Sequence, residues 1–157
     1  MKISALKNTI ISGQRTYPIY IAFIKASDVL KYAIVPNFNK SDKDKSIATN
    51  LQKTPVEKWQ RPLDDKPGGK RDKIIQTFNN TVEFMPNPVL LSENPYVENK
   101  ITAKPKVING QTSELWELNI PEAEKVIWII DGQHRINGLG HKDCKQNENL
   151  VPVCPSL

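Results

Sequence analysis

Five consecutive residues with chemically useful groups, Asp131-Gly132-Gln133-His134-Arg135, directly follow an apolar run of this chain. The arginine could hold a phosphate or carboxylate through paired N–H donors. The histidine could donate to a phosphate or act as an acid or base near neutral pH. The glycine would let backbone N–H groups approach an anion closely. The aspartate could orient the arginine, bind a cation or activate water, and the glutamine could donate to a ligand or tie the turn together.

The elements around these residues predict how they are positioned. Residues 126–130 read as a buried β-strand, and residues 136–139 continue as the first turn of a short helix. In α/β proteins, ligands are usually bound at such a strand-to-helix turn, outside the carboxyl end of the strand. The alternative is purely structural: Asp131 caps the helix, while His134 and Arg135 only satisfy the turn.

The rest of the chain predicts several short elements. Residues 26–32 fit a helix with Ser27 as N-cap, residues 71–79 fit a second helix, and residues 54–61 fit a capped helical turn. An Asn109-Gly110 turn predicts a hairpin. Strands are expected over residues 16–24, 89–91, 104–107, 115–118, 126–130 and 150–153. These elements predict an α/β or α+β fold, with a small mixed sheet and short flanking helices.

Composition and charge bound the possible functions. The 157 residues fit a single domain, and Cys144 and Cys154 are too few for a disulfide framework or a zinc site. No apolar stretch is long enough to cross a membrane, and no signal peptide is evident, so we expect a cytoplasmic protein without a membrane partner. No metal site is predicted.

The formal net charge of +5 is concentrated between Lys25 and Lys73, which hold twelve Lys and Arg against seven Asp and Glu. A local basic excess is typical of a nucleic-acid partner, and a solvated lysine-rich surface is the alternative. Trp59, within this segment, is a candidate for stacking on a base, whereas Trp116 and Trp128 are expected to be core anchors.

The Asp131–Arg135 sequence resembles the signature of the DGQHR-domain family. Residues 59–64 resemble the upstream Gln-Arg box of that family, and residues 84–91 resemble the strand that follows it. The resemblance covers roughly residues 15–155 and implies a ParB/sulfiredoxin-like fold. It implies that Gly132, His134 and Arg135 contact phosphate, that Asp131 and Gln133 support them, and that Gln60 and Arg61 lie near the same cleft.

The family includes the DndB-type proteins of bacterial DNA phosphorothioation systems. The resemblance therefore implies a DNA-binding protein that regulates transcription of DNA sulfur-modification genes, with DNA as its partner. Family members continue well beyond this turn, so residues 1–157 are expected to be a single DGQHR-type domain, the N-terminal portion of a longer architecture.

Two alternatives stay open. One is a ParB-like nucleotide hydrolase or nuclease with Asp131 or His134 in the chemistry, which would make a nucleotide the ligand. A single candidate acid at the turn argues against metal-dependent catalysis. The other is an inactive gene fragment. The sequence leaves the oligomeric state undecided.

Overall fold

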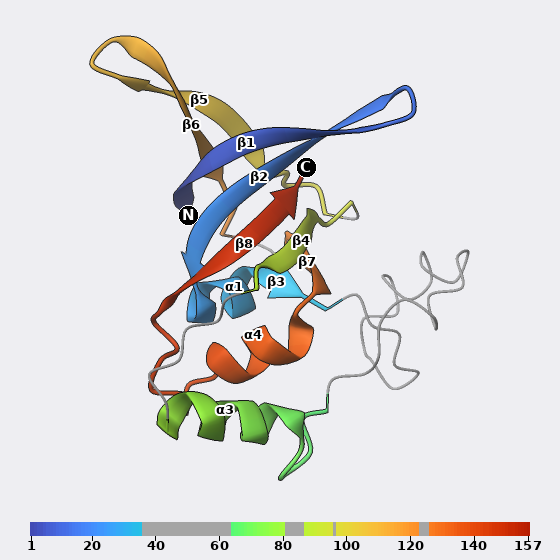
Figure 1. The fold of residues 1–157 in the computed structure, drawn as a ribbon, viewed down its shortest axis with the longest axis vertical. Helices are drawn as coiled ribbons and strands as arrows, with labels where there is room; N and C mark the ends of the chain where they lie inside the picture. The colour runs from blue at the N-terminus through green and yellow to red at the C-terminus, as the bar shows by residue number, and fades with distance from the viewer. Residues whose placement is uncertain (36–63, 81–86, 96, 123–125) are drawn as a thin grey trace.

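The computed structural model describes residues 1–35, 64–80, 87–95, 97–122 and 126–157 (Figure 1). The described part of the fold contains both strands and short helices and is of the mixed α and β class. In chain order the elements are β1 (Lys2–Ser12), β2 (Arg15–Lys25), α1 (Ala26–Tyr32), β3 (Ala33–Ile34), α3 (Lys70–Asn80), β4 (Val89–Glu93), β5 (Thr102–Ile108), β6 (Gln111–Asn119), β7 (Ile127–Asp131), α4 (Gln133–Leu139) and β8 (Leu150–Ser156).

All the described strands join one eight-stranded sheet in the order β3-β7-β4-β8-β2-β1-β6-β5. The β3–β7 and β4–β8 pairs are parallel, and the remaining neighbours are antiparallel. The predicted mixed sheet with short flanking helices is therefore confirmed. The sheet is larger than the small one expected, because two of its strands were not predicted: β1, which pairs with both β2 and β6, and the short β3, which pairs with β7.

Two hairpins extend from the body of the sheet (Figure 1). The β5–β6 hairpin turns at Asn109 and Gly110, whose φ angles of 52° and 78° are both positive. Two positive φ angles are what a type I′ turn requires, so the predicted Asn-Gly hairpin is confirmed. The β1–β2 hairpin turns beside Gly13, which also has a positive φ, of 60°.

The core lies between one face of the sheet and the helices. Alternate residues of the central strands, such as Val89, Leu91, Val151 and Val153, are buried in one cluster with residues of α1 and α4. Helix α4 lies between α1 and α3 (Figure 1). Trp128 is buried but is not among the residues of this cluster, and Trp116 is partly buried and packs against it, so the expectation that both are core anchors is met only in part.

Two predictions about the helices have different outcomes. Helix α1 has the predicted bounds, but the prediction of Ser27 as its N-cap was wrong. The helix follows directly from β2 with Lys25 as N-cap and no side-chain cap, and the Ser27 hydroxyl donates to Glu148 Oε1 at 2.8 Å. Helix α3 covers the predicted range and packs Ile75 and Phe78 against the core.

Some predictions lie outside the described residues. These include the helical turn over residues 54–61, with Trp59, and all of residues 36–63 of the basic segment between Lys25 and Lys73. In the part of the chain that the structure describes, no helix is long and apolar enough to cross a membrane.

Candidate functional site

Strand β7 leads directly into the Asp131–Arg135 turn. Val126, Ile127 and Ile129 are almost fully buried, so the strand is fixed in the core before it reaches the surface at Asp131. Helix α4 begins only two residues later, at Gln133. A strand-to-helix turn is therefore present as predicted, but the helix begins three residues before the expected residue 136, so Gln133, His134 and Arg135 belong to its first turn.

Gly132 gives this turn its shape. Its φ of 89° and ψ of 11° lie in the left-handed region, where a residue with a Cβ is strained. A Cβ here would also lie 3.1 Å from Arg135 Nη2 and 3.2 Å from Cγ2 of the buried Val89. Gly132 is itself the N-cap, and no side chain caps the helix, so the alternative reading of Asp131 as the cap is wrong.

Arg135 joins Asp131, at the start of the turn, to Asn87, which lies before β4. Its Nη1 donates to the Asn87 carbonyl oxygen at 3.0 Å, and its Nη2 lies 3.6 Å from Asp131 Oδ2. Asp131 is 70% exposed at the side chain and Arg135 is 31% exposed. Asp131 therefore lies at ion-pair distance from the arginine that it was expected to orient. The guanidinium is held at the surface by the end of β7 and by Asn87, two residues before β4.

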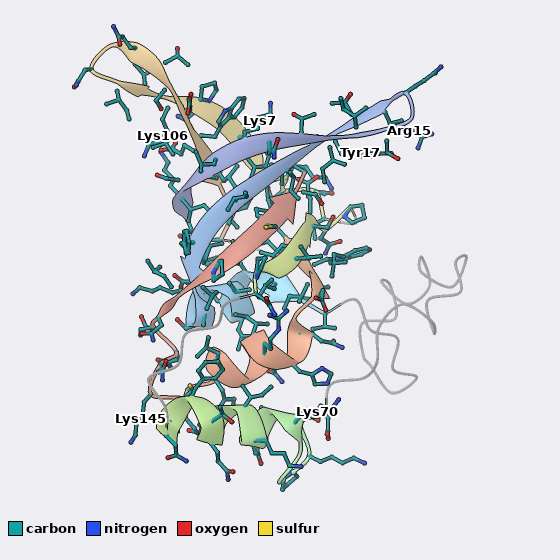
Figure 2. The ribbon with its side chains drawn as sticks, in the orientation of Figure 1. Lys7, Arg15, Tyr17, Lys70, Lys106 and Lys145 are labelled. Carbon is teal, nitrogen blue, oxygen red and sulfur yellow. The ribbon has the colours of Figure 1, made fainter. Side chains whose placement is uncertain are left out.

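His134 brings a distant segment to the turn. The backbone N–H of Asp64 donates to His134 Nε2 at 3.4 Å, across 70 residues of sequence. Asp64 in turn holds the start of α3, because its Oδ2 accepts from the Lys70 N–H and its carbonyl accepts from the Arg71 N–H, both at 3.2 Å. The contact therefore places Asp64, near the carboxyl end of the basic segment from Lys25 to Lys73, beside the turn. Lys70 lies at the start of α3, close to this contact in sequence (Figure 2).

The start of α3 is compact and rich in cations. The Gly68 N–H and the Arg71 side chain both bind Asp72, and together they lower the pKa of that carboxyl below its ordinary value. Lys66, Lys70 and Lys73 are exposed around this turn.

Two further glycines allow α4 to lie directly on its neighbours. A Cβ on Gly138 would come within 2.6 Å of Ile74 Cβ in α3, and one on Gly140 within 2.5 Å of the Ala26 carbonyl oxygen in α1. Both positions therefore require glycine for close packing. This packing fixes the distance between the Asp131–Arg135 turn and the start of α3.

The candidate residues differ in accessibility. Gln133 is buried, at 9% exposure, whereas His134 and Arg135 reach the surface in part. Gln60 and Arg61 lie outside the described residues, so their expected place near the turn stays a prediction.

Asp64 and Asn87 were not foreseen as part of the site. Both use backbone groups for their contacts with the turn, and a backbone contact leaves no signature in residue type.

The described residues contain no group of three or more His, Cys, Asp or Glu side chains that could hold a metal ion. Comparison with protein-family models, curated proteins and solved structures gives no match to this chain.

Proposed function

We propose that this protein is a DNA-binding regulatory protein associated with DNA sulfur modification, in which the Asp131–Arg135 turn contacts backbone phosphate. Arg135 and His134 would contact the phosphate directly, with Asp131 orienting the arginine. DNA is the partner, a ParB/sulfiredoxin-like fold is part of the proposal, and the expected location is the cytoplasm.

The contact between Asp64 and His134 carries this proposal. It joins the two features that each suggest an anionic ligand: the Asp131–Arg135 turn and the end of the basic segment. The chain has a formal net charge of +5, so the long-range field also favours a polyanion. Lys66 and Lys70 are exposed at the start of α3, and the rigid α3–α4 packing keeps them close to the turn.

The geometry of Arg135 supports binding of a phosphate more directly than it supports catalysis of a reaction. Arg135 already donates to Asn87 and pairs with Asp131, so its guanidinium is oriented before any ligand arrives. A pre-oriented guanidinium contributes to affinity because little side-chain entropy is lost on binding. Such a group binds phosphate without requiring any chemical step.

The test is a fluorescence-anisotropy titration of duplex DNA at several salt concentrations, using the full chain. For wild type, the logarithm of affinity should fall linearly with the logarithm of salt concentration. The double variant Lys66→Gln/Lys70→Gln should bind more weakly. The slope of log affinity against log salt concentration should become shallower by the amount that corresponds to about two lost phosphate contacts. Neither substitution removes a side-chain contact seen among the described residues, so folding should be unaffected.

The matched control is Arg15→Gln, at the tip of the β1–β2 hairpin, far from Lys70 (Figure 2). It removes one positive charge and should leave the salt dependence almost unchanged. If Arg15→Gln and Lys66→Gln/Lys70→Gln lower the DNA affinity equally per charge removed, the binding is only general electrostatic attraction to the protein. A folded protein without DNA affinity would refute the proposal and direct attention to nucleotide hydrolysis, assayed with Asp131→Ala.

A further inference from the structure

The sheet has a second face, and that face is apolar as well. The registers place one set of large side chains from four neighbouring strands, β4, β8, β2 and β1, on the face opposite the core. Each is between 41% and 56% exposed. The set, here called the outer patch, consists of Leu6 and Ile10 of β1, Tyr17, Ile21 and Phe23 of β2, Leu90 of β4 and Leu150 of β8.

The sequence of β2 shows that this exposure is unusual. A strand with one solvated face normally alternates apolar and polar residues. From Tyr17 to Ile24, β2 carries no charged residue and is apolar on both faces. Its inward residues Tyr20 and Ala22 are buried in the core, while Ile21 and Phe23 are exposed. This is the pattern of a strand buried on both sides.

Charge lies at the rim of the patch. On β2, Arg15 and Lys25 flank the apolar positions, and Arg15 and Tyr17 lie toward the tip of the hairpin (Figure 2). Asp131 borders the patch beside its register partner Leu90. Lys25 is paired with Glu148 at 2.8 Å. An apolar centre with charges only at the rim is the composition of a protein–protein interface.

We propose that the outer patch is the interface of a homodimer, in which a second copy of this chain covers the open face of the sheet. Side chains of this size at about half exposure present roughly 500–700 Å² of apolar surface per copy. Two copies would bury about 1,000–1,400 Å², close to the lower limit of about 1,200 Å² for stable interfaces. A patch without charge at its centre can pack against itself across a twofold axis.

A nucleic acid is a poorer occupant, because the centre of the patch has no cation to meet phosphate. The proposed dimer does not rest on the proposed DNA binding: the outer patch and the Asp131–Arg135 turn share no residue, although Leu90 of the patch pairs with Asp131 in the sheet.

The test is sedimentation velocity of the full chain over roughly 1–100 µM, the range in which a dimer of this interface area should form. Wild type should approach twice the chain mass of 17.8 kDa. Phe23→Glu should raise the dimer dissociation constant at least about 100-fold, because it places an unpaired carboxylate within the interface. Ile21→Lys, in the same patch, provides a second variant should the first fail to fold.

Ile11→Glu is the matched control. Ile11 is 74% exposed on the neighbouring strand but lies on the opposite face, because Ile10 pairs with Tyr17 and Ile11 with Thr16. The Ile11→Glu variant should therefore have the same dimer dissociation constant as wild type. A wild-type protein that is cooperatively folded yet monomeric at the highest concentration would overturn the proposal. So would equal weakening by Ile11→Glu and Phe23→Glu, or monomers that bind lipid vesicles through Phe23.

Discussion

Replacing Gly132 by alanine should destabilise the protein more than the same change at Gly110, which has a similar φ but open space around it. The backbone conformation, with φ of 89°, costs an alanine about 1–2 kcal/mol. The added Cβ would also lie 3.2 Å from Cγ2 of Val89, which is fully buried and cannot move aside freely. Overpacking of this kind typically costs another 1–3 kcal/mol. We therefore expect a total loss of about 2–5 kcal/mol in the free energy of unfolding.

Gly110→Ala separates the two contributions. Gly110 has a similar φ of 78°, and no atom lies within 4 Å of where its Cβ would be. It should therefore show the backbone cost alone, about 1–2 kcal/mol. Chemical denaturation of both variants measures the difference directly. If Gly132→Ala costs no more than Gly110→Ala, then Val89 and Arg135 do not constrain the turn, and the reasoning about its shape fails.

Two further predictions concern packing and pH. Gly138→Ala should destabilise the protein by about 1–3 kcal/mol through collision with Ile74, and Ile74→Ala should recover part of that loss in a double-mutant cycle; additive losses would contradict the contact. The pKa of Glu148 is lowered by hydrogen bonds and charge from Lys25 and by the Ser27 hydroxyl. Its stabilising contribution should therefore be complete above its ordinary pKa and lost as the pH falls through the lowered value. Denaturation from about pH 6 to pH 3 should show the gap between wild type and Glu148→Gln closing, and a constant gap would contradict the linkage.

The parts of the fold that sequence predicted depend on local signals. The run from Val126 to Ile130 is apolar, and Gly132 follows it, so the strand and the turn after it could be predicted, although α4 begins three residues before the expected start at Ile136. The Asn109-Gly110 hairpin was predictable for the same reason, because both φ angles are set by the turn residues themselves.

The parts that sequence missed depend on distant contacts. In β1 only Ala5 is buried, so the strand has no clear alternation and is held by pairing with β2 and β6. Ser27 has the residue type of an N-cap, but its hydroxyl binds Glu148, 121 residues away. The contact between Asp64 and His134 likewise spans 70 residues and involves a backbone N–H. Neither pairing can be read from local residue patterns.

The most direct test of the central claim is the salt dependence of duplex DNA affinity for wild type, Lys66→Gln/Lys70→Gln and Arg15→Gln. If the Asp131–Arg135 turn and the start of α3 bind DNA phosphate together, the double variant alone should lose affinity and about two units of salt slope. Identical slopes for all three folded proteins would contradict that claim.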